Sequence, residues 1–265
     1  MRSRCTVAIV TGGSSGIGLA AARALRDQGL KVYVLSRHPF SEKGLHHLCA
    51  DVADERQCAE AFETVLHKEG DVDLLVNCAG FGISGAVEFT EQADAKKQME
   101  INFFGTVNMT KAVLGYMHQR GNGRIVNISS VAAPAAIPFQ AYYSATKAAI
   151  NAWTAALANE VRPYGITVTA IQPGDIKTGF TAAREKSIAG DEAYGGRISK
   201  SVAKMEHDEQ NGMDPAVAGA YIAKIALKDK PKPVYTIGFS YKAICVLLKL
   251  LPCRLSNWLI GKLYA

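Results

Sequence analysis

Short apolar segments alternate with longer helical ones along almost the whole chain, and this alternation limits the fold more than any other feature. The apolar, β-branched runs occupy residues 6–10, 31–35, 45–50, 72–76, 124–128, 166–171 and 234–237. Helical periodicity fills the segments 17–28, 53–68, 92–118 and 142–161, and Asp214-Pro215 starts one more helix. Continuous apolar strands separated by helices form a parallel sheet with right-handed crossovers. We therefore predict an α/β fold: a single doubly wound (Rossmann-type) parallel sheet with helices on both faces.

Length and composition agree with one globular domain. The chain has 265 residues, of which 48% are hydrophobic and 20% charged, so general disorder is excluded. No apolar run approaches the roughly 18 residues that a membrane span needs. The apolar stretch behind Met1-Arg2-Ser3-Arg4 is too short for a signal peptide. We predict a cytoplasmic protein.

Cysteine and histidine spacing gives no sign of a metal site. The six cysteines form no C-x-x-C pair and have no metal-ligand spacing with the six histidines. His46 and His47 are adjacent in a short strand, so their side chains lie on opposite faces. We predict no metal, and cysteines that are reduced and structural.

A glycine-rich turn joins the first strand to the first helix, with the sequence Thr11-Gly-Gly-Ser-Ser-Gly-Ile-Gly18. Glycines at such a turn let the backbone approach a pyrophosphate, which then lies at the N-terminus of the helix. Glycines alone are weak evidence, but their position between a strand and a helix makes the signal strong. The turn predicts a dinucleotide site formed by Gly12, Ser14, Ser15, Gly16, Ile17 and Gly18.

Three polar residues are arranged for carbonyl chemistry. Tyr143 and Lys147 are four residues apart on one helix, so both side chains project from one face. A neighbouring ammonium should lower the pKa of the phenol from its usual value of about 10, which favours acid–base catalysis. Ser130 follows the fifth strand, at the sheet edge where such folds bind ligands, and could polarise a substrate carbonyl.

The spacings T-G-x-x-x-G-x-G and Y-x-x-x-K, in this order, resemble the short-chain dehydrogenase/reductase family in its compact single-domain branch. The resemblance covers nearly the whole chain and implies a catalytic set of Asn102, Ser130, Tyr143 and Lys147. The resemblance implies that Tyr143 is the acid in ketone reduction and the base in alcohol oxidation. Lys147 also holds the nicotinamide ribose, and Asn102 holds a water that relays protons.

The same resemblance implies further cofactor contacts. Asp51 and Val52 would border the adenine, and Asn77-Cys-Ala-Gly80 matches the family's N-N-A-G except at Cys78. The loop that covers the nicotinamide would contain Pro173, Gly174, Ile176 and Thr178. The resemblance therefore implies that Asn77, Ala79, Gly80, Tyr143 and Lys147 also contact the cofactor.

The end of the second strand favours NADP(H) over NAD(H). An acidic residue there would bind the adenosine ribose and repel a 2′-phosphate, but the chain has Ser36-Arg37-His38. Arg37 can form charge-assisted hydrogen bonds with a 2′-phosphate, and Ser36 lies beside it. Arg37 as a solvated surface residue stays as the alternative.

The last third of the chain carries two further features. Residues 178–213 are polar and irregular, which predicts a mobile substrate lid. The predicted substrate contacts are Phe180 of this lid together with Ser130 and Tyr143. The catalytic domain would span 1–240, followed by a basic, amphipathic helical extension over 241–265. From Lys228 onward there are seven basic residues against one acid. The extension either packs on the domain or on another subunit, or it contacts a membrane surface peripherally.

These observations predict an NADP(H)-dependent oxidoreductase that interconverts a ketone and a secondary alcohol. The lid loosely resembles that of family members acting on steroids and other lipids, so the expected substrate is a small hydrophobic carbonyl or alcohol. The alternatives are a 3-oxoacyl-thioester reductase and a non-catalytic, NADPH-binding regulatory protein. No basic stripe with interleaved aromatics indicates nucleic-acid binding. The resemblance also implies a homodimer or homotetramer.

Overall fold

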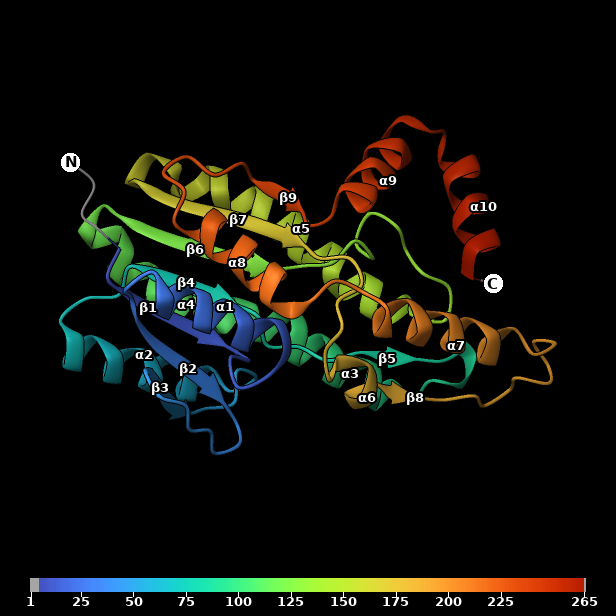
Figure 1. Cartoon of the computed structure of the whole chain (residues 1–265), viewed down its shortest axis with the longest axis horizontal. Coiled ribbons are helices and arrows are strands. Elements are labelled where there is room, and N and C mark those ends of the chain that lie inside the picture. Colours follow the sequence, from blue (N-terminus) through green and yellow to red (C-terminus); the bar gives the residue numbers. More distant parts are fainter. Residues whose placement is uncertain (1–4, 265) are drawn as a thin grey trace.

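The computed structural model describes residues 5–264 and is built around one parallel sheet (Figure 1). Its spatial order is β3-β2-β1-β4-β6-β7-β9, and every neighbouring pair is parallel. The strands are β1 (Val7–Thr11), β2 (Lys31–Ser36), β3 (Leu45–Cys49), β4 (Leu74–Asn77), β6 (Gly123–Ile128), β7 (Ile166–Gln172) and β9 (Val234–Thr236). The predicted doubly wound α/β fold is confirmed.

Two layers of helices cover the sheet. One face packs against α1 (Gly16–Asp27) and α8 (Pro215–Ala226), and the other against α2 (Glu55–Glu69), α4 (Gly105–Arg120) and α5 (Ala141–Val161). The alternation of side chains along β1 shows why both faces are apolar, since Ala8 and Val10 join the first layer while Val7 and Ile9 join the second. Both layers of the core are therefore encoded in the same short strand.

Local signals fix where several helices begin and end. The Asp54 carboxylate caps α2 by accepting hydrogen bonds from the backbone N–H groups of Arg56 (2.9 Å) and Gln57 (3.1 Å). Gly70 ends that helix in the left-handed conformation, with φ of 72°. Asp214 caps α8 at 2.7 Å from the Ala216 N–H, as expected from Asp214-Pro215.

The helix expected over 92–118 is interrupted. It consists of α3 (Gln92–Met99), a π-helical turn (Glu100–Phe104) and α4. Such π turns are rare and concentrate at functional positions. Here the wider turn carries Asn102, which is fully buried. An average helical period cannot reveal one extra residue in a turn, so the sequence pattern predicted a continuous helix.

The segment 178–213 is more regular than predicted. It contains α6 (Phe180–Ala183), β8 (Glu185–Lys186), which pairs with β5 (Ile83–Ser84), and the helix α7 (Arg197–Gln210). Ile198, Val202 and Met205 give α7 a narrow apolar face that packs on Ala86. The expectation of irregular structure was wrong because the other faces of α7 are solvated, and these made the segment look polar throughout.

The chain ends in two helices, α9 (Phe239–Leu250) and α10 (Cys253–Tyr264), which we call the C-terminal hairpin (residues 239–264). Figure 1 shows the hairpin in red, standing off the sheet, with α10 returning towards α7. The Tyr241 hydroxyl donates to the Asp175 carboxylate at 2.5 Å and anchors α9 beside β7. None of the helices between residues 5 and 264 is both long and apolar enough to cross a bilayer.

Candidate active site

A cavity of about 380 Å³ opens at the carboxyl ends of the central strands, where the chain order reverses between β1 and β4. It brings together many of the predicted residues: Gly12, Ser14, Ser15, Gly16, Ile17, Gly18, Ala79, Gly80, Ser130, Tyr143, Lys147, Pro173, Gly174, Ile176, Thr178 and Phe180. The remaining predicted residues are not on its wall: Ser36, Arg37, Asp51, Val52, Asn77 and Asn102.

The glycine-rich turn is shaped for a diphosphate. A Cβ atom on Gly12, whose φ is 63°, would lie 2.8 Å from the Ala79 Cα, and one on Gly18 would lie 2.3 Å from the Gly12 carbonyl oxygen. Side chains are therefore excluded at these two positions of the turn. Helix α1 begins at Gly16, and the N–H groups of its first turn have no partner within the helix. This cradle fits the pyrophosphate of a dinucleotide.

Two polar side chains below the cavity fix its floor. The Thr11 hydroxyl accepts hydrogen bonds from the backbone N–H groups of Cys78 (3.0 Å) and Ala79 (3.1 Å), which holds the loop after β4 against β1. Asn77 donates to the Asn127 side chain at 2.9 Å and is buried between β4 and β6. The sequence placed Asn77 in the cofactor shell, whereas the structure places its side chain in the core beneath that shell.

Asn102 braces the same loop from the other side. Its side-chain oxygen accepts from the Phe81 N–H at 2.9 Å, and its amide donates to the Phe81 carbonyl (3.0 Å) and to Thr146 Oγ1 (3.2 Å). Thr146 precedes Lys147, so the π-helical turn, the loop after β4 and α5 are joined at one point. The proposed water relay through Asn102 stays a prediction.

Tyr143 and Lys147 share one face of α5, with the Lys147 Nζ atom 5.6 Å from the centre of the phenol ring. Burial raises the pKa of Tyr143 to about 12, although hydrogen bonding with Ser130 acts in the opposite direction. Burial also lowers the pKa of Lys147 to about 8. The sequence predicted a lowered pKa for Tyr143. That prediction is wrong for this structure, because burial of the phenol is the largest influence on its pKa. The Lys147 ammonium donates a hydrogen bond to the Ile128 carbonyl at 2.9 Å.

The far wall of the cavity comes from residues that carried no motif. Met205 and Glu209 of α7 and Tyr264 of α10 line it together with Phe180. The Phe180 ring lies between Tyr143, at 5.8 Å between ring centres, and the Arg184 guanidinium, at 5.6 Å. Arg184 is fully buried and forms an ion pair with Glu209. Phe180 was predicted as a substrate contact, but no sequence signal marks Met205, Glu209 or Tyr264, because the segments that carry them meet only in the folded chain.

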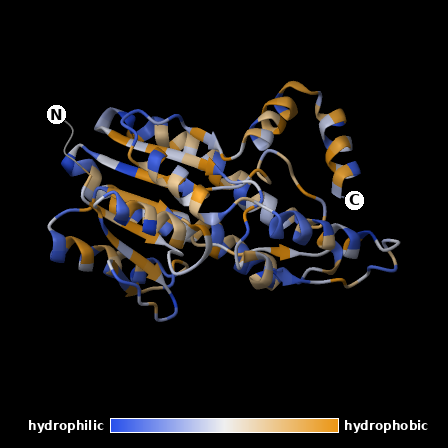
Figure 2. Cartoon of the chain, in the orientation of Figure 1, coloured by the Kyte–Doolittle hydropathy of each residue, from blue (hydrophilic) through white to orange (hydrophobic). Residues whose placement is uncertain are grey.

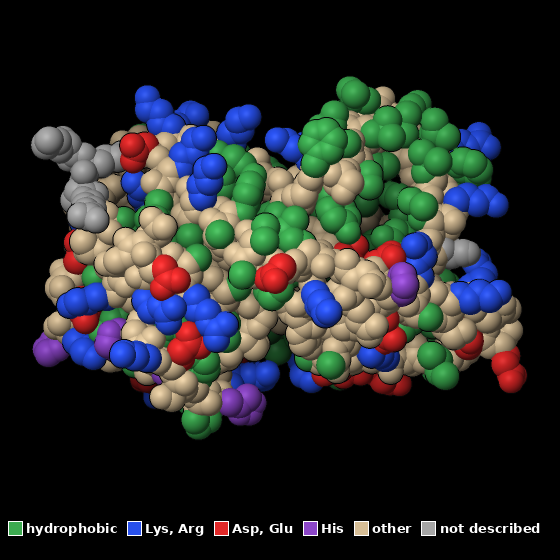
Figure 3. Space-filling view, in the orientation of Figure 1, with side chains coloured by type: hydrophobic (Ala, Val, Ile, Leu, Met, Phe, Trp, Pro, Cys, Tyr) green, Lys and Arg blue, Asp and Glu red, His purple; other side chains and the backbone are tan. Residues whose placement is uncertain are grey.

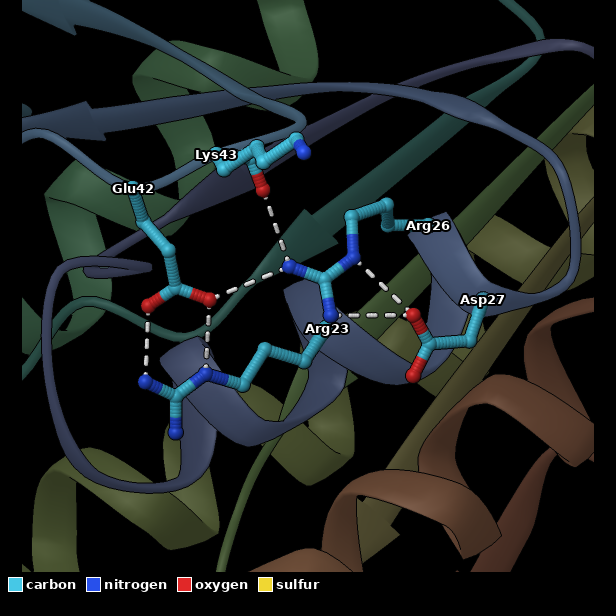
Figure 4. Close-up of polar contacts among 5 residues, drawn as sticks. All are labelled: Arg23, Arg26, Asp27, Glu42 and Lys43. Atoms are coloured by element: carbon cyan, nitrogen blue, oxygen red, sulfur yellow. Dashed lines mark hydrogen bonds and ion pairs between the residues drawn. The ribbon is translucent and has the colours of Figure 1, made fainter.

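Two arginines of α1 and the arginine that follows β2 differ in their partners. Figure 4 shows Arg23 and Arg26 of α1 both directed at Glu42. Their guanidinium groups lie 2.7 Å and 3.1 Å from its carboxylate oxygens. Arg37 is exposed, and among the described residues its side chain forms no ion pair. Arg37 is therefore the one of these three arginines with a free guanidinium.

The family model for short chain dehydrogenases matches residues 6–189, which contain the glycine-rich turn and all of Asn102, Ser130, Tyr143 and Lys147. The chain belongs to the short-chain dehydrogenase/reductase family. The 3-ketodihydrosphingosine reductase of Bacteroides thetaiotaomicron is 41% identical over 228 residues, which are 85% of each chain.

Solved structures of short-chain dehydrogenases agree with this membership. A short-chain dehydrogenase from Streptomyces avermitilis has a TM-score of 0.83 and 30% identity, over 97% of this chain and 96% of that one. ElxO, solved with NADP bound, has a TM-score of 0.75 and 28% identity, over 90% and 99% of the two chains. As a short-chain dehydrogenase/reductase, the protein is an oxidoreductase that uses a nicotinamide cofactor.

Proposed function

We propose that the protein is an NADP(H)-dependent reductase of a ketone carried on a long apolar chain, and that it also catalyses the reverse alcohol oxidation. The observation that carries this proposal is the cavity itself. Its wall combines the polar side chains of Ser130, Tyr143 and Lys147 with the largely apolar side chains of Phe180, Met205 and Tyr264. Similarity to a reductase of 3-ketodihydrosphingosine supports the same class of substrate.

In this proposal Tyr143 is the catalytic acid. Since its pKa is raised to about 12, the phenol is protonated at neutral pH and can give its proton to the carbonyl oxygen as the ketone is reduced. Ser130 hydrogen-bonds and polarises that carbonyl. The charge of Lys147 then stabilises the phenolate that remains. When bound, the nicotinamide supplies or accepts the hydride.

The cofactor would lie across the carboxyl edge of the sheet. The first turn of α1 holds the pyrophosphate, Asp51 and Val52 border the adenine, and the loop of Pro173, Gly174, Ile176 and Thr178 covers the nicotinamide. The exposed and unpaired Arg37, beside Ser36, would bind the 2′-phosphate that distinguishes NADP(H) from NAD(H). The ElxO structure with bound NADP supports this preference.

A panel of ketones tests the proposed reaction. With NADPH, we expect turnover of ketones on long alkyl chains and at least tenfold lower kcat/KM for short aliphatic ketones, because about 0.8 kcal/mol is gained per buried methylene group. Oxidation of NADPH, followed at saturating cofactor, measures this. Preference for 3-oxoacyl thioesters would instead support a thioester reductase. Tight NADPH binding without turnover of any ketone would support the regulatory alternative.

We further propose that the C-terminal hairpin rests on an anionic lipid surface, which would make the protein peripheral to a membrane. Figure 2 shows many hydrophobic residues along this hairpin, and Figure 3 shows apolar side chains gathered on it. Its exposed apolar residues are Phe239, Ile244, Val246, Leu247, Leu250, Leu255, Trp258 and Leu263. Its exposed cations are Lys242, Lys249, Arg254 and Lys262, and it has no acidic residue. Apolar side chains between cations suit an interface with anionic lipid.

The substitution Leu250→Asp tests the lipid contact, since Leu250 is 77% exposed near the tip of the hairpin and lies off the cavity wall. We expect co-sedimentation with phosphatidylglycerol-containing vesicles to fall about tenfold, because a charge at this position opposes burial in the interface. Val217→Asp, at a site 56% exposed on α8, is the matched control. Failure of the wild-type protein to bind these vesicles would overturn the lipid contact. We propose a homodimer or homotetramer as the assembly, and the mass of the protein in solution tests it.

A further inference from the structure

Glu209 holds a carboxylate in the substrate cavity that the proposed reaction does not use. It belongs to α7 and lines the cavity together with Tyr143 and Phe180. Its side chain is 14% exposed, whereas that of its partner Arg184 is 0% exposed. The other carboxylate on the cavity wall, Asp175, already accepts a hydrogen bond from the Tyr241 hydroxyl. A nearly buried carboxylate loses hydration, so such a group normally has a specific partner.

Two neighbours, Arg184 and Thr181, fix the Glu209 carboxylate in place. One oxygen faces the buried guanidinium of Arg184, and the other accepts a hydrogen bond from the Thr181 hydroxyl at 2.6 Å. Gln140 holds Arg184 in turn. With the Gln140 amide oriented so that its oxygen faces the guanidinium, this oxygen accepts hydrogen bonds from Arg184 at 3.2 Å. Because each carboxylate oxygen has two lone pairs, Glu209 can still accept a hydrogen bond from the cavity.

The position of this cluster relates it to the reacting carbonyl. Gln140 lies three residues before Tyr143 at the start of α5, about one helical turn from the catalytic phenol. Phe180 packs between Tyr143 and Arg184. Glu209 is also the charged group that raises the pKa of Tyr143 most, after the effect of burial. A substrate whose ketone meets Tyr143 would therefore place its neighbouring atoms close to Glu209.

We propose that Glu209 is a specificity-determining residue that binds a hydrogen-bond donor, preferably an ammonium, one or two carbons from the ketone of the substrate. This proposal rests on the proposed ketone reductase function and narrows its substrate to long-chain amino ketones. The apolar chain would lie along Met205 and Tyr264, and the polar head would face Glu209. Arg184 and Thr181 are positioning residues, because they hold the carboxylate and do not themselves line the cavity.

The test compares two ketones of equal chain length. One is a long-chain 2-amino-1-hydroxy-3-ketone, and the other is the 3-ketone without the amino and hydroxyl groups. For wild-type protein we expect the amino ketone to have the higher kcat/KM. In Glu209→Gln the ratio of the two kcat/KM values should fall roughly 10- to 100-fold, which is the usual effect of losing one charged hydrogen bond. The change should be mainly in KM.

Controls separate this role from a structural one. Glu206→Gln, one turn earlier on α7 and paired with Lys186 away from the cavity, should keep the wild-type ratio. If Glu209 only neutralises Arg184, Glu209→Gln will lower kcat/KM for both ketones alike, and the proposal is overturned. Equal wild-type efficiency with both ketones would also overturn it while leaving the reductase function intact. Turnover of neither ketone would remove the proposed function and this inference together.

Discussion

Replacing Tyr143 by Phe should lower kcat for ketone reduction by about 1,000-fold, because a positioned general acid contributes roughly 100- to 10,000-fold to such a step. The phenol ring lies against Phe180 at 5.8 Å, and its hydroxyl is not used to hold any backbone group within residues 5–264. Removing only the hydroxyl therefore leaves the packing of α5 in place. Steady-state oxidation of NADPH at saturating ketone measures the loss.

Tyr142→Phe is the matched control, since it removes the same atom from the neighbouring residue of α5, which is not on the cavity wall. It should retain wild-type kcat. Binding of NADPH, followed by its fluorescence, should change less than about threefold in Tyr143→Phe, because the lost group acts on the substrate carbonyl. A Tyr143→Phe protein that reduces ketones at the wild-type rate would exclude Tyr143 as the acid.

The sequence was most informative where the chemistry is local. The run Val7–Val10 is continuously apolar because both faces of its strand are buried, and the structure has β1 at Val7–Thr11. The glycine-rich turn was equally readable, since Gly12 and Gly18 make backbone contacts that no side chain would permit. Tyr143 and Lys147 were placed together by helix geometry alone, and the structure has them on one face of α5.

Features that depend on long-range packing could not be predicted. The pKa of Tyr143 is governed by how deeply the phenol is buried, and the spacing from Lys147 contains no information about depth. Glu209 and Tyr264 reach the cavity only because α7 and α10 fold back over it. The buried pair of Arg184 and Glu209 is separated by 24 residues and reads in the sequence as two ordinary surface charges.

The proposed preference for NADP(H) rests on one exposed side chain, Arg37, so we expect one substitution to weaken it. Arg37→Glu should lower the ratio of kcat/KM with NADPH to kcat/KM with NADH by roughly 100-fold, since a charged hydrogen bond is worth about 1.5–3 kcal/mol and the new carboxylate also repels the 2′-phosphate. Arg23 and Arg26 cannot compensate, because Glu42 already engages both guanidinium groups.

Arg162→Glu is the matched control, because it makes the same change of charge far from the proposed phosphate site. Arg162 follows α5 and leads into the amino end of β7. The comparison separates the loss of a local contact from a change in the net charge of the protein. Arg162→Glu should preserve the wild-type ratio. If Arg37→Glu also preserves it, then Arg37 is a solvated surface residue and the 2′-phosphate is recognised elsewhere. Because the ratio compares two cofactors on the same protein sample, a loss of folded protein lowers both kcat/KM values equally and leaves their ratio unchanged. The measurement therefore reports on recognition of the phosphate and not on stability.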